Sequence, residues 1–358
     1  RPPRDPQLHR QAVRPPLKMP RILVIALCAL GLVRGDAKTL AEAADSLSSR
    51  LPAGCIVTAE QTPQGKRFAL SGQSPDPKQA PETLVFEIAS LTKIFTGILL
   101  AEAVVGKKVS LDTTVAELLE PGFKFADARV GRISLRQLST HTSGLPRMPD
   151  NFPDGFKSYS TYDDSQMLAW LAKVRLKRDG PHDCSYSNVG VALLGFLVAK
   201  QYGKPWSDCV VERICKPLGM PHTLPSHLPS PGTVAPPHAG SGPAIVTTFR
   251  AFAPAGSLRS TAADMLVFGE ALAHPERTPI EAALKLALRP HADAKTKKGK
   301  IGLGAFLVGP PEHVAYVHDG ATAGYRSAIQ VIPSADIVRI VLMNNNTVEG
   351  SDVLKAMR

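Results

Sequence analysis

The sequence lacks the patterns that mark metalloproteins, membrane proteins and nucleic-acid-binding proteins. It has five cysteines among 358 residues, with no CxxC pair, no HExxH and no clustered histidines, so we expect no metal and no cofactor. Its long apolar run, residues 22–33, is too short to cross a bilayer comfortably. Aromatic residues make up only 6%, and no basic run contains interleaved aromatics, which argues against a nucleic-acid partner.

Acidic residues are fewer than basic ones, and the formal net charge is +11. Almost half of this excess lies in residues 1–37, and the remainder is spread over the rest of the chain. A small excess of basic residues spread over a long chain is typical of a solvated surface that tolerates anionic cell-envelope polymers. We therefore do not interpret the charge as a nucleic-acid footprint.

The segment before residue 38 has the pattern of an export signal. Arg21 precedes the apolar run, and the small residues Gly35 and Ala37 fit the rule for a cleavage site. The alternative interpretation is a buried N-terminal helix. We predict a signal peptide at residues 19–37 that starts at Met19, and an exported protein, periplasmic or secreted, with no membrane span after cleavage.

Four cysteines follow the predicted signal peptide: Cys55, Cys184, Cys209 and Cys215. We expect Cys209 and Cys215 on one helix but on different faces, too far apart to form a disulfide with each other. For the other pairs the sequence leaves disulfide formation open.

Strand-like segments lie near both ends of the chain, and helical spacing dominates residues 111–220. A connector at residues 217–243 is too rich in proline for a helix or a central strand. We therefore predict an α/β fold in which an antiparallel sheet is flanked by helices and carries an inserted, mostly α-helical domain. The α/β part is expected at residues 38–110 and 245–358, and the helical insertion with its connector at residues 111–244.

Ser90-Leu91-Thr92-Lys93 is the first candidate for chemistry. At helical spacing, residues i and i+3 share a face, so the Ser90 hydroxyl and the Lys93 amine can meet. A helix start favours a developing anion, and partial burial would lower the pKa of Lys93 so that it accepts a proton. On this motif alone, a helix cap with a solvated lysine is the better interpretation, because chance supplies one such motif per chain of this size.

Two further elements supply polar side chains. Tyr186-Ser187-Asn188 precedes a helical run, and a phenol beside an ammonium would have a lowered pKa and could shuttle protons. His318-Asp319-Gly320 follows a strand-like segment, and we expect a cationic His318 on an edge strand with Gly320 permitting close approach of a substrate. Taken singly, each element also fits a loop or a helix cap.

In this order and spacing, the three elements resemble those of the serine penicillin-recognising enzymes, in particular the class C β-lactamases and the related D-alanyl-D-alanine carboxypeptidases and esterases. The resemblance covers residues 40–346. Further segments that look like family landmarks are 86–90, 138–146, 217–220 and 256–265.

The resemblance implies a role for each candidate residue. Ser90 would be the nucleophile, Lys93 its general base or proton relay, and Tyr186 a proton-transfer group. Substrate binding would involve the Asn188 side chain, His318, Gly320 and the backbone N–H of Ala321, which with that of Ser90 would form an oxyanion hole. Residues 141–146 would form a structural turn, and no Gly-x-Ser-x-Gly elbow marks Ser143 as a rival nucleophile.

Two departures from the family pattern bear on the substrate. His318 stands where typical β-lactamases have lysine, and a histidine is only partly charged at neutral pH, so it selects a carboxylate less firmly. Asp319 would repel a carboxylate if it faced the site, or keep His318 protonated if it faced away. We therefore expect D-alanyl peptides, with peptidoglycan as a candidate partner, or small esters as substrates. The alternatives are hydrolysis of β-lactam antibiotics and, in another class, a non-catalytic penicillin-binding or sensor module.

Overall fold

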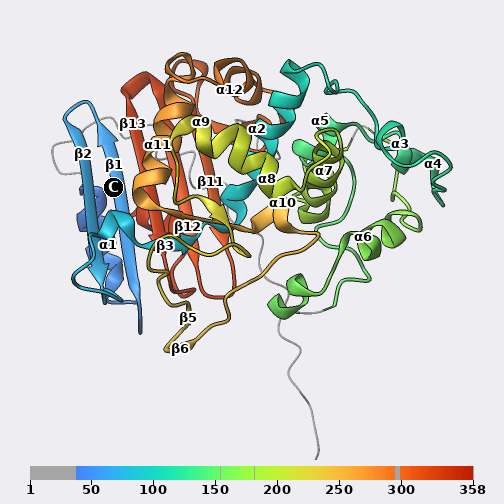
Figure 1. Cartoon of the computed structure of the whole chain (residues 1–358). Coiled ribbons are helices and arrows are strands. Elements are labelled where there is room, and N and C mark those ends of the chain that lie inside the picture. Colours follow the sequence, from blue (N-terminus) through green and yellow to red (C-terminus); the bar gives the residue numbers. More distant parts are fainter. Residues whose placement is uncertain (1–37, 154, 181, 295–298, 358) are drawn as a thin grey trace, which may run out of the picture.

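The computed structural model describes residues 38–153, 155–180, 182–294 and 299–357 (Figure 1). The predicted signal peptide, the residues before it and Cys28 lie outside the described residues. Within the described ranges, no helix combines the length and the apolar character needed to cross a membrane. All four described cysteines are buried and none forms a disulfide.

An eight-stranded antiparallel sheet, drawn at the left of Figure 1, is built from both ends of the described chain. The first of the two strands that follow the first helix pairs with the last strand, so that Ile56 lies opposite Met343, and the second strand pairs with the first. The strand order is β2 (Gly65–Gly72), β1 (Cys55–Thr62), β13 (Ile337–Met343), β12 (Arg326–Ile332), β11 (Ala315–Ala321), β10 (Phe306–Val308), β9 (Gly299–Ile301) and β8 (Ala292–Asp293).

Helices cover both faces of the sheet because successive strand residues point to opposite faces. Ile56 packs with Leu40 and Val353 from α1 (Leu40–Ser48) and α13 (Gly350–Lys355). The next residue, Val57, belongs instead to the main core, to which α11 (Ala262–Ala273) contributes its buried face. The main core thus lies between the sheet and the helical part of the molecule.

The helical part centres on α2 (Thr92–Val105) and α7 (Asn188–Lys200), which contact each other. In α2 eleven of fourteen residues are buried, as expected for a helix that is apolar on nearly all sides. Around them lie the remaining helices: α3 (Val115–Leu118), α4 (Ala128–Gly131), α5 (Leu135–Ser139), α6 (Asp164–Leu171), α8 (Trp206–Val210), α9 (Lys216–Leu218), α10 (Ala253–Gly256) and α12 (Glu281–Ala287).

After the end of α9 at Leu218, the proline-rich connector forms only short edge strands. Leu224–Pro225 (β4) pairs with one side of β7 (Leu258–Thr261), whose other side pairs with β3 (Val85–Glu87). His238–Ala239 (β5) and Gly242–Pro243 (β6) form a separate two-stranded hairpin. These strands fit the expectation that proline excludes a helix or a central strand here.

The predicted fold class is confirmed: helices flank an antiparallel sheet in a mixed α/β fold. The division into residues 38–110 with 245–358 and residues 111–244 stays a prediction. The prediction ended the strand of the third motif too early, because His318-Asp319-Gly320 lies within β11, which extends to Ala321.

A close contact between backbones fixes α2 against the segment before β10. A Cβ added at Gly97, in the middle of α2, would collide with the carbonyl oxygen of Leu303. Gly304, which has a φ of 90°, likewise lies against the backbone of Lys93. Both positions therefore require glycine, and the contact holds the first turns of α2 in place.

We predict that Gly97→Ala destabilises the protein by about 2 kcal/mol or more, because the added methyl overpacks a backbone contact. An alanine normally stabilises a helix interior by about 1 kcal/mol relative to glycine, so the sign itself is informative. Urea unfolding measures the effect, with Val105→Ala as a control because Val105 is 47% exposed at the end of the same helix. A stability gain in Gly97→Ala would contradict the packing described.

Candidate active site

Ser90 lies in a tight turn between β3 and α2. The turn is a single 3₁₀ element, Ala89–Leu91, and the α-helix proper begins at Thr92. Ala89 has a φ of 50°, in the left-handed region that residues other than glycine rarely adopt. This bend leaves the Ser90 side chain half-buried at a cavity while the flanking Ala89 and Leu91 are buried.

Lys93 follows one turn later and meets Ser90, as the motif predicts. Its Nζ lies 3.0 Å from Ser90 Oγ and donates a hydrogen bond of 2.6 Å to the carbonyl oxygen of Ala255 in α10. The residue is 1% exposed. Burial, together with the nearby charge of Arg147, holds the pKa of Lys93 well below its usual value. A neutral amine in this position can accept the proton of Ser90.

Tyr186 packs beside Lys93, but the prediction of a lowered pKa for its phenol is wrong. The ring centroid lies 5.0 Å from Lys93 Nζ, and the phenol interacts with the Ser90 side chain. Burial raises the pKa of Tyr186 above its usual value, whereas the sequence suggested a lowered one. The reason is that the ring is buried, and burial disfavours the charged phenolate more than the hydrogen bond with Ser90 favours it. Tyr186 is therefore a neutral phenol, which can relay a proton by giving up its own as it takes up another.

A second loop holds Tyr186 in place through His141. The backbone N–H of Ser187 donates to His141 Nδ1 at 3.2 Å, and the N–H of Ser185 donates to the His141 carbonyl at 2.8 Å. The imidazole and the Tyr186 ring lie 4.5 Å apart, centroid to centroid. His141 is buried and has a left-handed φ of 61°. The expected structural turn at residues 141–146 therefore positions the phenol.

His318 lies on the same face of the site, and the structure corrects two predictions about it. First, β11 is not an edge strand, because it lies between β12 and β10. Its pairing with β10 ends at Val317, so residues 318–321 are paired on one side only. Second, His318 is not cationic. It is 2% exposed, and burial, with the nearby Lys93, lowers its pKa to about 3. Its Nδ1 lies 2.6 Å from the backbone oxygen of Asp319.

Asp319 does not keep His318 protonated. Its side chain is on the opposite side of β11, as strand alternation requires, and it interacts electrostatically with Glu349 and Lys355 near α13. Burial, followed by the charge of Glu349, raises the pKa of Asp319 to about 6. Of the two alternatives drawn from the sequence, the carboxylate thus faces away from the site but leaves the imidazole neutral.

Glycine is needed at position 320 because of a close contact within the protein. A Cβ at this position would lie 2.6 Å from the carbonyl oxygen of Ile88 and 3.0 Å from the Cβ of Ala89. The missing side chain therefore lets β11 approach the turn that carries Ser90. The glycine therefore serves the turn that carries the nucleophile, and close approach of a substrate at Gly320 stays a prediction.

The remaining predicted residues line a cavity of about 510 Å³ with Ser90 at its base. Ala321 lines it beyond the end of the β10 pairing, and Asn188 does so with its Nδ2 3.5 Å from the sulfur of Met148. One wall is aromatic, formed by Phe152, Phe156, Tyr159, Phe249 and Phe252. The structure thus brings all seven predicted site residues to one region.

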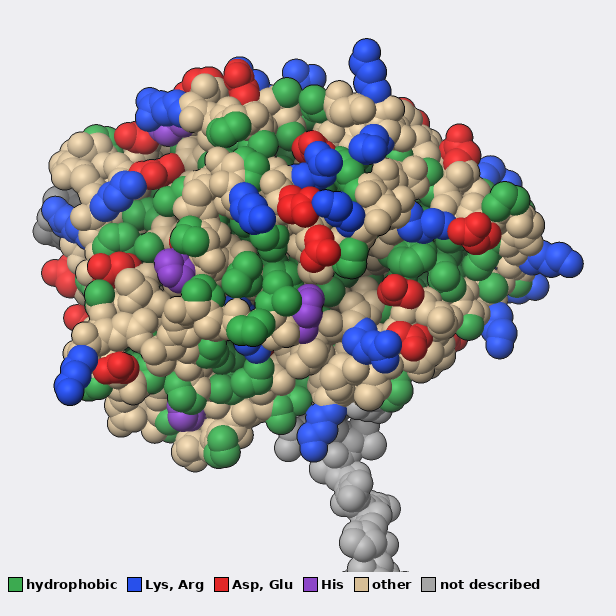
Figure 2. All heavy atoms as spheres, in the orientation of Figure 1, with side chains coloured by type: hydrophobic (Ala, Val, Ile, Leu, Met, Phe, Trp, Pro, Cys, Tyr) green, Lys and Arg blue, Asp and Glu red, His purple; other side chains and the backbone are tan. Residues whose placement is uncertain are grey.

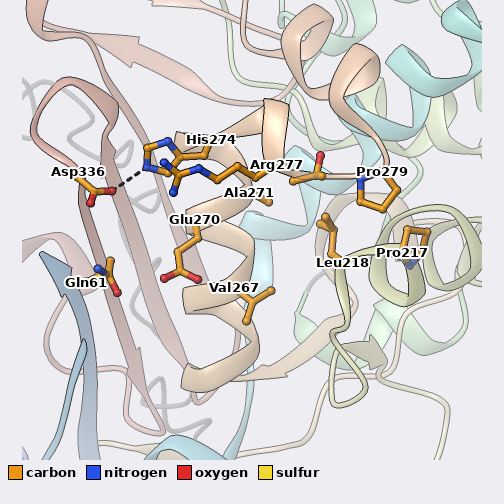
Figure 3. A pocket seen from close by; sticks show the side chains of 11 residues that line it. Gln61, Pro217, Leu218, Val267, Glu270, Ala271, His274, Arg277, Pro279 and Asp336 are labelled. Atoms are coloured by element: carbon orange, nitrogen blue, oxygen red, sulfur yellow. Dashed lines mark hydrogen bonds and ion pairs between the residues drawn. The ribbon is translucent and has the colours of Figure 1, made fainter. Parts of the chain in front are cut away.

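Titratable side chains also line other hollows among the described residues, the larger of which, about 730 Å³, lies beside α8. A hollow of about 320 Å³ beside α11 contains His274, whose Nε2 lies 2.8 Å from Asp336, as Figure 3 shows. Glu270 of this hollow is already paired with Lys66. On the face drawn in Figure 2, basic and acidic side chains alternate without a continuous basic patch. No group of three or more His, Cys, Asp or Glu residues in the described ranges is arranged to hold a metal ion.

The sequence analysis missed three contributions to the site. The sequence does not mark the carbonyl of Ala255, because every residue has a backbone carbonyl. Ala255 does, however, directly precede the landmark at 256–265. His141 was noted only as part of a turn. Arg147 follows the landmark at 138–146, and its guanidinium carbon lies 5.2 Å from the centroid of the Tyr186 ring.

Comparisons with known proteins agree with this geometry. A family profile described as Beta-lactamase matches residues 56–358. Penicillin-binding protein 4 of Amycolatopsis lactamdurans is 30% identical over 292 residues, which cover 73% of this chain and 72% of that protein. The D-alanyl-D-alanine-carboxypeptidase/endopeptidase AmpH of Escherichia coli (strain K12) is 31% identical over 147 residues, covering 41% of this chain and 38% of that protein.

A solved class C beta-lactamase from Rhodobacter sphaeroides has the same fold, with a TM-score of 0.76 at 23% identity over 89% of this chain and 97% of that one. The profile spans most of the described residues, including every residue of the candidate site. On this evidence the chain belongs to the beta-lactamase family, as the motifs predicted.

Proposed function

We propose that the protein is a serine hydrolase that forms an acyl-enzyme on Ser90. The observation that carries this proposal is the buried Lys93 amine, 3.0 Å from the Ser90 hydroxyl, with its pKa held well below that of an ordinary lysine. A lowered pKa favours the neutral amine, which can take the serine proton directly. Membership of the beta-lactamase family supports the same chemistry.

In the proposed reaction, Ser90 Oγ attacks the substrate carbonyl and its proton moves to Lys93 Nζ. The backbone N–H groups of Ser90 and Ala321 stabilise the oxyanion. The Tyr186 phenol, which interacts with the Ser90 side chain, passes its proton to the leaving group as the carbonyl re-forms and takes up the proton that Lys93 received, so that both groups are neutral again. Water then attacks the ester, and the same groups return the proton to Ser90 Oγ as the acid is released.

The proposed substrates are D-alanyl peptides or small esters. The relatives named a penicillin-binding protein and a D-alanyl-D-alanine carboxypeptidase support the peptide, and export through the predicted signal peptide would bring the enzyme to peptidoglycan. Hydrolysis of β-lactam antibiotics is a second candidate, favoured by the fold of class C beta-lactamases. The neutral His318 argues against it, because it offers no charge to the antibiotic carboxylate.

We predict that wild-type protein is labelled by a fluorophosphonate or a fluorescent penicillin, and that Ser90→Ala abolishes labelling and lowers ester turnover by about 10³-fold or more. Gel fluorescence and a p-nitrophenyl butyrate assay measure the two effects. Ser185→Ala is the matched control, since Ser185 is exposed and adjacent to Tyr186. If the folded wild-type protein took no label, the non-catalytic alternative would replace this proposal.

We also predict that His318→Lys shifts preference toward substrates that carry a carboxylate. A lysine supplies a longer, more basic side chain, and hydrogen bonds to charged groups contribute about 1.5–3 kcal/mol, or roughly tenfold or more in relative turnover. The test compares a chromogenic cephalosporin and a D-Ala-D-Ala peptide with p-nitrophenyl butyrate, and uses His318→Gln as a neutral control. Equal substrate ratios in His318→Lys and wild type would show that residue 318 does not select the carboxylate.

A further inference from the structure

The buried basic side chains of the site, Lys93, His141 and His318, are poorly suited to bind a carboxylate of the substrate. The pKa values of Lys93 and His141 lie well below their usual ranges, and that of His318 is about 3, in each case chiefly through burial. All three side chains are also at most 2% exposed, so none of them presents an accessible positive charge to the end of an acyl chain. An anionic substrate would need a cation from elsewhere in the cavity.

Arg147 is the one basic side chain among the described residues that line the cavity, and arginine stays protonated at all physiological pH values. Among the described residues it has no ion-pair partner within 4.0 Å. It is exposed to solvent, so its guanidinium is accessible to a ligand. Its charge also reaches the reacting groups, because it contributes to lowering the pKa of Lys93.

The backbone and the side chain of Arg147 are both held in place. Its carbonyl oxygen accepts a hydrogen bond of 3.0 Å from the N–H of Asn188, at the first residue of α7. The guanidinium lies over the Tyr186 ring, a geometry in which cation–π attraction favours the charged group. Positioning of this kind lowers the entropy lost when a ligand binds.

We propose that Arg147 binds a carboxylate on the acyl part of the substrate, so that this hydrolase selects acidic acyl donors. Met148, Asn188 and the aromatic wall line the same cavity, and we place the acyl chain beside Asn188. The described lining contains one acidic residue, Asp150, which is exposed to solvent. An acyl chain with an apolar stem and a terminal carboxylate fits both surfaces: the stem packs on Tyr159 and Phe249, and the carboxylate pairs with the guanidinium fork. This inference rests on the proposed acyl-enzyme chemistry and adds the substrate class.

The test uses two esters with one leaving group, mono-p-nitrophenyl adipate and its methyl ester, which differ only in the charge at the end of the acyl chain. We expect Arg147→Gln to lower the ratio of their kcat/KM values, anionic over neutral, by about 10- to 100-fold. The change should appear mainly in KM, because an anchor far from the reacting carbonyl binds ground state and transition state alike. Arg147→Lys should keep part of the preference, since it retains the charge without the fork.

Arg132→Gln is the control, because Arg132 is also exposed but does not line the cavity. Taking the ratio removes any general effect of Arg147 on Lys93, which would act on both esters equally. An unchanged ratio in Arg147→Gln, with both esters still hydrolysed, would overturn the assignment of Arg147 alone. Failure of the wild type to hydrolyse either ester or to take a Ser90 label would instead overturn the proposed function.

Discussion

The site depends on the burial of one amine. Lys93 sits in the interior between α2 and α10, where its Nζ contacts Ser90 Oγ and the Ala255 carbonyl. The pKa of Lys93 is lower in the folded than in the unfolded state, so the residue lowers the stability of the folded protein at neutral pH. This loss of stability becomes smaller as the pH rises toward the pKa of an ordinary lysine. We propose that this loss of stability is retained because it provides a base that can activate Ser90.

The surrounding structure keeps that amine fixed. Glycine at positions 97 and 304 allows α2 to pack backbone to backbone against the segment before β10, and Gly320 brings β11 against the turn of Ser90. Thr96 adds a hydrogen bond of 2.7 Å to the carbonyl of Pro254, next to Ala255. Local conformations that are costly alone, such as the left-handed Ala89 and His141, are held by these contacts.

The sequence allowed the fold class to be predicted, and its three motifs named seven residues that the structure brings to one region, because each motif combines local periodicity with a fixed order along the chain. Electrostatics could not be predicted in the same way. Whether Tyr186 lies beside an ammonium or an amine, and whether His318 is charged, depends on burial by segments far away in sequence, including β10 and α10. The Ala255 carbonyl is a backbone group and has no sequence signal, and β11 could not be traced to its end because the strand continues through a glycine.

The most direct test of this account is the pH dependence of Ser90 acylation, measured as the rate of labelling by a fluorophosphonate in wild-type protein. If the buried Lys93 is the base, the rate falls in acid as the amine gains a proton, and its plateau begins well below the pKa of an ordinary lysine, near 10.4. A rate that instead climbed by roughly tenfold per pH unit up to that value would show that Lys93 is an ammonium at neutral pH, and it would contradict the account.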